Sequence, residues 1–453
     1  MPEEGRDEAR APTATGASGA AGRTERTGSR TFLKALGPGV LWAGAAVGVS
    51  HLVQSTRAGA GFGLGLLGVV LFACLFKYPA FQFGPRYAAA TGTSLLEGYR
   101  RQGPWALALY ALVTLGTMFT VQATVVAVTA ALLAAMIDRI RPALGPAPVI
   151  PLSIVLTAVG AGLLLVGHYK WLDKIVKVVV GVLTVTTLIA TLLALPRVPF
   201  GTLRLLPAAD WVTTSLIAVA ICGLIGWMPS AFDISIWHSL WTLARRRETG
   251  HAPSVREAVL DFDVGYVGTA VLAVCFVLMG AGVMFESGRE FAPQPAAFAA
   301  QVIALYTENL GAWTGPIIAL SAFTVMFSTT LTVIDGFPRA LATLASRFGG
   351  PETPGAPDDI SRRIYWAALA TLGAGSILVI AFLARSLPRM VDVATTLSLV
   401  TAPPLAWLNH RAIIGAEVPQ AARPGRGLRA WSWFSIWTSV VLAVYYVVTR
   451  LAG

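Results

Sequence analysis

Eleven runs of mainly apolar residues, each at least about 20 residues long, make up most of this chain. A helix needs about 20 such residues to cross the hydrocarbon core of a bilayer. The runs are continuous and do not alternate with a period of two, which favours helices over barrel strands. We therefore expect an all-α integral membrane protein. The expected helices cover residues 36–60, 65–90, 104–136, 148–167, 172–195, 211–244, 262–285, 312–338, 363–384, 390–409 and 430–449.

The composition agrees with a membrane protein, because charged residues are only 13% of the chain. Soluble proteins carry about 25%. The net charge of +11 comes from basic residues in short loops, a distribution typical of membrane insertion and not of nucleic-acid binding. Residues 1–30 lack the apolar side chains that a folded core needs, so we expect a disordered cytoplasmic tail. Residues 31–453 are expected to form a single transmembrane domain.

The distribution of Lys and Arg predicts the orientation. With the N-terminus in the cytoplasm, 24 of these residues fall on the cytoplasmic side and 9 on the other. This bias and the odd number of helices place the C-terminus outside. Two basic residues inside the second run, Lys77 and Arg86, are expected to extend toward the cytoplasmic surface.

Two of the runs contain helix-breaking residues near their middle. The first reads GPGVLWAGAAVGVSHLVQSTRAGAGFG, and the sixth contains Gly223, Gly226 and Pro229. Interrupted helices at corresponding positions of two halves are the best sequence indication of a transporter's binding site. We therefore expect helices 1 and 6 to be broken within a 5+5 inverted repeat. The alternative for either break is a simple packing kink.

Four segments carry a resemblance to a known family. The run from Gly37 to Gly63 resembles the first helix of the NRAMP family of divalent-metal transporters. The stretch FQFGPRYAAATG (81–92) resembles the end of its second helix, and KWLDKIVKVVVG (170–181) the start of its fifth. Residues 226–229 match its sixth-helix Met-Pro. The resemblance implies a LeuT-type fold and secondary transport of a cation by alternating access.

The chain departs from the family at the positions that bind metal. The first-helix Asp and Asn of the family are replaced by Gly48 and His51. The sixth-helix Met is kept as Met228, whereas the histidine that follows its proline is Ser230. The resemblance therefore implies a divergent branch with a remodelled ligand set.

The family's acidic pair for proton movement falls near Val121 and Thr124, neither of which ionises. Proton coupling is therefore not carried over. We expect an NRAMP-like secondary transporter of a divalent metal cation of the Mn/Fe/Mg class, without a cofactor. Two alternatives remain open: a LeuT-fold transporter of a small organic solute, and a non-transporting membrane sensor on the same scaffold. Enzyme motifs such as GxSxG, HExxH and Walker A are absent.

The candidate site lies at the two breaks. The predicted substrate-binding residues are Gly48, Ser50, His51, Gln54, Ile225, Met228 and Asp233, and the candidate metal ligands among them are His51, Met228 and Asp233. Imidazole, thioether and carboxylate groups all ligate metals. The structural alternatives are a histidine bonded to freed backbone, an aspartate paired with Arg57 or His238, and a packing methionine.

The expected partners are a small ion or solute and the lipid bilayer, with no nucleic acid. A monomer is compatible with the sequence. The short loops and the family resemblance indicate the inner (plasma) membrane of a cell. The three cysteines, Cys74, Cys222 and Cys275, lie within apolar runs and are expected to be buried and free.

Overall fold

Nine apolar helical segments in the described part of the chain are long enough to cross a membrane. This computed structural model describes residues 37–141, 147–285, 311–354, 361–383 and 386–452, together with 292, 297, 299–301, 303, 304 and 307. The predicted tail at 1–30 lies outside these residues. The nine segments are Leu67–Thr91, Pro104–Ile140, Val149–Val166, Tyr169–Arg197, Val255–Met284, Ala312–Gly349, Arg362–Phe382, Arg389–Ile413 and Arg426–Leu451.

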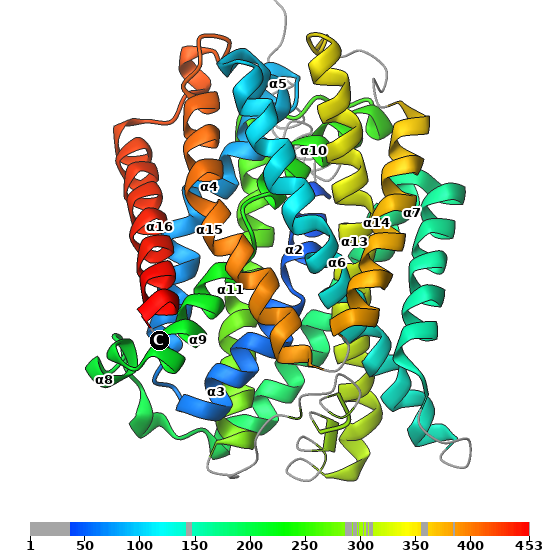
Figure 1. The fold of residues 1–453 in the computed structure, drawn as a ribbon, viewed down its shortest axis with the longest axis vertical. Helices are drawn as coiled ribbons and strands as arrows, with labels where there is room; N and C mark the ends of the chain where they lie inside the picture. Colours follow the sequence, from blue (N-terminus) through cyan, green and yellow to red (C-terminus); the bar gives the residue numbers. More distant parts are fainter. Residues whose placement is uncertain are drawn as a thin grey trace, which may run out of the picture.

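The first and sixth crossings are built from shorter pieces. The first consists of α2 (Pro38–Ala46), a π-helical turn η1 (Ser50–Ser55) and α3 (Thr56–Phe62). The sixth consists of α9 (Ser215–Trp227) and α10 (Ile234–Thr249). These pieces and the nine long segments account for the eleven predicted crossings, with the interruptions where the sequence places them (Figure 1).

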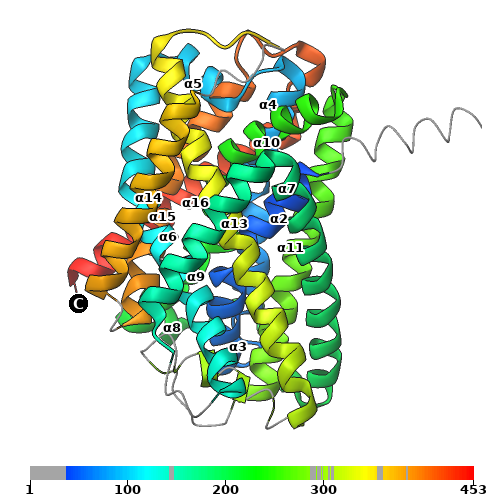
Figure 2. The ribbon, with the colours of Figure 1, turned by 90° about the vertical axis from the view of Figure 1, so that its right-hand side faces the viewer.

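The other helices surround these two broken crossings. The helix α5 lies at one end of the bundle, and α3 and α8 lie at the opposite end (Figures 1 and 2). We call these the α5 end and the α3 end. The remaining helices are α4 (Leu67–Thr91), α5 (Leu95–Gln102), α6 (Pro104–Ile140), α7 (Val149–Ala194), α8 (Ala209–Thr213), α11 (Val255–Met284), α13 (Gly315–Gly349), α14 (Arg362–Leu383), α15 (Leu387–Ile413) and α16 (Arg426–Ala452).

Helix α7 holds two crossings, although the chain stays helical throughout its 46 residues. An unbent helix of that length would measure about 69 Å, more than twice the hydrocarbon thickness. In the first half, Gly160 faces Ile334 of α13, whereas Thr186 in the second half donates to Ser321 nearer the start of α13. The chain therefore runs along α13 and returns, as the predicted helices 148–167 and 172–195 require.

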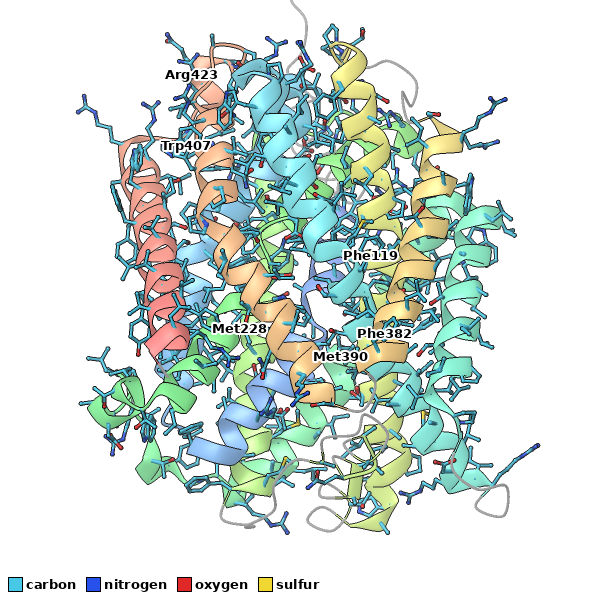
Figure 3. All side chains as sticks on the ribbon, in the orientation of Figure 1. Phe119, Met228, Phe382, Met390, Trp407 and Arg423 are labelled. Carbon is cyan, nitrogen blue, oxygen red and sulfur yellow. The ribbon has the colours of Figure 1, made fainter. Side chains whose placement is uncertain are left out.

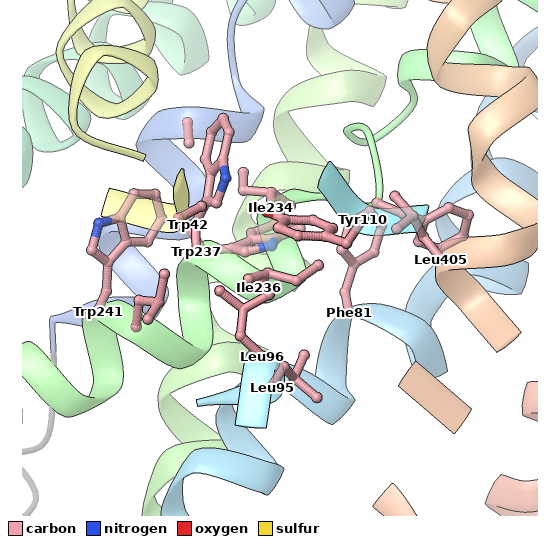
Figure 4. Packing of buried hydrophobic residues seen from close by; sticks show 14 of the residues in the cluster. Trp42, Phe81, Leu95, Leu96, Tyr110, Ile234, Ile236, Trp237, Trp241 and Leu405 are labelled. Carbon is pink, nitrogen blue, oxygen red and sulfur yellow. The ribbon is translucent and has the colours of Figure 1, made fainter. Parts of the chain in front are cut away.

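Apolar side chains fill the interior and also cover the outer helices. Phe382 of α14 is 81% exposed, as expected for a side chain that faces lipid (Figure 3). The inner cluster joins Trp42 of α2 to Phe81 of α4, with ring centroids 5.4 Å apart, and includes Tyr110 and Trp237 (Figure 4). The three cysteines are free and buried.

The half-helix α2 packs backbone to backbone against α11. A Cβ atom on Gly39 would lie 1.9 Å from the carbonyl oxygen of Asp261, and one on Gly265 would lie 2.1 Å from that of Gly39. The Asp261 carboxylate accepts the backbone N–H groups of Gly37 and Gly39. Small residues thus allow the close approach, and the carboxylate satisfies two N–H groups of the first turn.

A buried ion pair lies on α13 toward the α5 end. The guanidinium of Arg339 donates two hydrogen bonds to Asp335, at 2.7 and 2.9 Å. The same carboxylate accepts Trp241 Nε1–H of α10 at 2.9 Å and the Tyr365 hydroxyl of α14 at 3.0 Å. Asp335 is therefore fully satisfied and connects three helices.

Candidate substrate site at the breaks of helices 1 and 6

The break in helix 1 is centred on Val47 and Gly48, between α2 and η1. The hydroxyl of Thr329 on α13 lies 3.1 Å from the Gly44 carbonyl oxygen and 3.0 Å from that of Val47. A Cβ atom at Gly48 would lie 2.6 Å from that hydroxyl oxygen. Glycine at 48 is therefore required for Thr329 to reach the carbonyls that the break frees.

The break in helix 6 covers Met228 to Asp233, between α9 and α10. The ammonium group of Lys77 on α4 donates to the carbonyl oxygens of Ile225, Gly226 and Ser230, at 2.6, 3.0 and 3.3 Å. Lys77 is only 1% exposed, so the expectation that it extends to the surface is wrong. Its three N–H donors are instead used by carbonyl oxygens inside the protein.

A cavity of about 50 Å³ lies between the two breaks. A volume of this size holds a few water molecules. Its wall is formed by residues of the two breaks and of α2, η1, α6, α9, α10 and α13: Ala45, Ala46, Gly48, Val49, Ser50, Val121, Val125, Trp227, Ser230, Ala231, Asp233, Ile234, Trp237, Thr329 and Val333.

Asp233 is the ionisable side chain of this wall, within the part of the chain that the structure describes. It is 5% exposed and precedes the first residue of α10. No described Lys, Arg or His forms an ion pair with it, so the pairings with Arg57 and His238 are absent. A carboxylate at this depth is costly without a cation or water beside it.

His51 is fully buried and turned away from the cavity toward α11. Its Nε2 lies 3.1 Å from the Thr269 carbonyl oxygen, which can only accept, so Nε2 carries a hydrogen. Its Nδ1 lies 2.8 Å from the Ser50 hydroxyl. Both ring nitrogens are thus used in bonds within the protein.

The remaining predicted residues divide between the cavity and its surroundings. Gly48 and Ser50 belong to the cavity wall with Asp233. The amide nitrogen of Gln54 would lie 3.6 Å from a Cβ atom at Gly223, so Gln54 faces α9. The Ile225 carbonyl binds Lys77, and Met228 is buried in an apolar cluster. Three of the seven predicted residues therefore meet at the cavity.

Lys77 and Ser230 are functional candidates that the sequence patterns do not predict as site residues. A lysine in the middle of an apolar run is itself a signal of a functional or structural role, because such residues are rare in membranes. For Ser230, the family resemblance shows only that it replaces a histidine. Its position in the break was the available signal.

No group of three or more His, Cys, Asp or Glu side chains that could hold a metal occurs in the described residues. A cation in the cavity would therefore take one carboxylate, and hydroxyl, carbonyl or water oxygens for its other ligands. Oxygen ligands of this kind suit hard cations.

Comparison with known proteins shows the family to which this chain belongs. The family model described as Natural resistance-associated macrophage protein-like (Nramp) matches residues 39–449. The chain belongs to the Nramp family. An uncharacterized protein of Pasteurella multocida is 36% identical over 388 residues, which cover 84% of this chain and 86% of that protein. The NRAMP resemblance is confirmed, and membership makes the chain a multi-pass membrane transporter.

Solved structures agree on the fold. A single-residue variant of the Eremococcus coleocola manganese transporter has a TM-score of 0.68 at 16% identity, over 93% of this chain and 86% of that one. MhsT in complex with L-phenylalanine has a TM-score of 0.63 at 15% identity, over 91% and 97%. The prediction of an all-helical LeuT-type membrane fold is confirmed.

Proposed function

We propose that this Nramp-family protein is a secondary transporter that carries a divalent metal cation through the cavity by alternating access. The observation that supports this most directly is the Asp233 carboxylate in the cavity wall without a basic partner among the described residues. A divalent cation would balance this charge. No cofactor takes part in the proposed cycle.

The cavity wall is mainly apolar, and its carboxylate and hydroxyl oxygens favour the harder members of the Mn/Fe/Mg class. Ser50, Ser230 and Thr329 bring hydroxyl groups to the wall, whereas the Met228 sulfur and the His51 ring lie outside it. Mg²⁺ in particular keeps several of its waters and binds through one or two carboxylates. We therefore propose that Mg²⁺ or Mn²⁺ binds partly hydrated, with Asp233 as the charged ligand.

The size of the cavity favours an ion over an organic solute. Its volume is about 50 Å³. A space that holds only a few water molecules leaves little room for an organic solute. An ion that keeps only a few of its waters matches a space of this size.

The Lys and Arg distribution supports a cytoplasmic α5 end, a cytoplasmic N-terminus and an external C-terminus in the inner (plasma) membrane. Arg423, on the side with the basic excess, lies at the α5 end (Figure 3). A protease site added after Gly453 should be cleaved in intact spheroplasts. Cleavage only after lysis would show that the C-terminus is cytoplasmic and would contradict this orientation.

Uptake into proteoliposomes with an internal metal-sensitive dye tests the function. We expect the wild type to take up Mn²⁺ or Mg²⁺, and Asp233→Asn to reduce uptake at least about tenfold. Asp210→Asn is the matched control, because Asp210 is exposed on α8. Absence of uptake of both ions by folded wild type would contradict divalent transport. Unchanged uptake by Asp233→Asn would place the site elsewhere.

A further inference from the structure

The surroundings of Lys77 are those of a bound cation. An ammonium group has three N–H donors, and Lys77 directs them at three carbonyl oxygens. Ile225 and Gly226 belong to the last turn of α9, and Ser230 lies in the helix 6 break. The rings of Phe232 and Phe76 lie 5.4 and 6.0 Å from the nitrogen. No described carboxylate forms an ion pair with Lys77. Carbonyl dipoles and aromatic faces therefore stabilise the charge.

The position of these carbonyls explains why a cation is needed. Helix α9 ends at Trp227, and the residue four positions after Ile225 is Pro229, which has no N–H to donate. The Ile225 carbonyl oxygen therefore keeps only a 3.3 Å hydrogen bond from the Met228 N–H as a backbone contact. The C-terminal end of a helix also carries the negative end of the helix dipole. Unwound carbonyls and half-helix C-termini of this kind coordinate cations in membrane transporters.

We propose that the carbonyl oxygens of Ile225, Gly226 and Ser230 form a monovalent-cation site that this chain fills permanently with its own Lys77 ammonium. The carbonyl groups at the helix 6 break then need no cation from solution. This site is separate from the divalent cargo, and the proposal does not depend on what the cavity carries.

Lys77 also acts as a positioning residue for the cavity. The Ser230 carbonyl oxygen accepts from Lys77, while Ser230 itself belongs to the cavity wall beside Asp233. The ammonium therefore fixes the backbone from which the wall of the cavity is built, and it does so without contacting the cargo.

The test removes the ammonium and offers a free cation instead. We expect Lys77→Ala to lower the melting temperature of the purified protein by roughly 5 °C, because buried carbonyls lose their donors. Ammonium, Na⁺ or K⁺ chloride should restore it in a saturable manner, whereas N-methyl-D-glucamine chloride at equal ionic strength should not. Wild type should respond equally to all four salts.

Lys77→Met is the second variant, because its apolar chain fills the space and leaves no room for a cation. It should melt as low as Lys77→Ala and show no specific response to small cations. The proposal is overturned if Lys77→Met is as stable as wild type, if wild type itself requires Na⁺ or K⁺, or if no small cation stabilises folded Lys77→Ala. Recovery of folded Lys77→Ala only from ammonium or Na⁺ buffers would support it. Because stability is measured without divalent ions, these outcomes are independent of the uptake experiment.

Discussion

Asp261 of α11 holds the first turn of α2 through Gly39, whose backbone N–H donates to the carboxylate at 2.6 Å. The other carboxylate oxygen accepts the N–H of Gly37 at 3.0 Å. The first N–H groups of a helix have no acceptor within it, so a side chain from another helix completes the turn. A half-helix of nine residues is thereby anchored at the end away from its break.

Asp261→Asn should lower stability by about 0.5–2 kcal/mol, the range found for lost helix caps. An asparagine offers one oxygen acceptor, and its amide N–H₂ would face the second N–H. Thermal unfolding of the purified protein measures the loss. Asp263→Asn on the same helix is the control, because asparagine can still accept from the Tyr78 hydroxyl. Equal losses in both variants would contradict a specific role of Asp261.

Gly265→Ala should force α2 and α11 apart. The added Cβ would lie 2.1 Å from the Gly39 carbonyl oxygen, a backbone atom that cannot rotate away. Overpacking of this kind costs about 1–3 kcal/mol. Gly268→Ala, three residues along the same helix, has nothing within 4 Å of the added atom and should be neutral. A melting temperature of Gly265→Ala equal to that of Gly268→Ala would contradict the close contact.

His51→Gln should distinguish a structural role of His51 from a role as a metal ligand. Because the ring nitrogens contact Thr269 and Ser50 and not the cavity, we expect lower stability and divalent-cation affinity within about threefold of wild type. Loss of a direct ligand would instead weaken binding by at least about 10- to 100-fold. Calorimetric titration with Mn²⁺ provides the measurement, with Asp233→Asn as the comparison. A tenfold loss in His51→Gln would establish His51 as a ligand.

Glu97 on α5 should make stability depend on acidic pH. Burial alone would raise its pKa, but hydrogen bonds from Arg100 and the Glu352 backbone, with the charges of Arg100 and Arg101, hold the pKa below its ordinary value of 4.5. A carboxylate with a lowered pKa stabilises the folded protein fully above pH 4.5, and this stabilisation is lost as the pH falls through the lowered pKa.

The melting-temperature difference between wild type and Glu97→Gln should therefore be constant at neutral pH and shrink below pH 4.5. Glu248→Gln is the control, since its carboxylate lies near the surface, 3.9 Å from Lys170. Surface pairs of this type contribute about 0–1 kcal/mol. A Glu97→Gln difference that grows toward acidic pH would contradict the inferred charge state.

The sequence was sufficient for the crossings and the breaks, but not for the directions of side chains near the breaks. Apolar length and Gly or Pro positions act locally, so they predict interrupted helices at 36–60 and 211–244. The π-helical turn at Ser50–Ser55 changes the angular spacing of the residues, so a period of 3.6 could not predict that His51 faces α11. The partner of Lys77 is about 150 residues distant, and no local pattern encodes it.

The hydrogen bond from Trp241 to Asp335 is a polar contact that α10 would lose if it moved away from α13. The ion pair of Asp335 with Arg339 lies within α13, so displacement of α10 leaves both charges matched. The moving half-helix breaks one hydrogen bond to a charged group, worth about 1.5–3 kcal/mol. Rupture of a buried ion pair would cost about 3–5 kcal/mol. The Trp241 hydrogen bond is thus a polar cost that adds to the apolar contact of Trp237 with Phe337, whose ring centroids lie 4.7 Å apart.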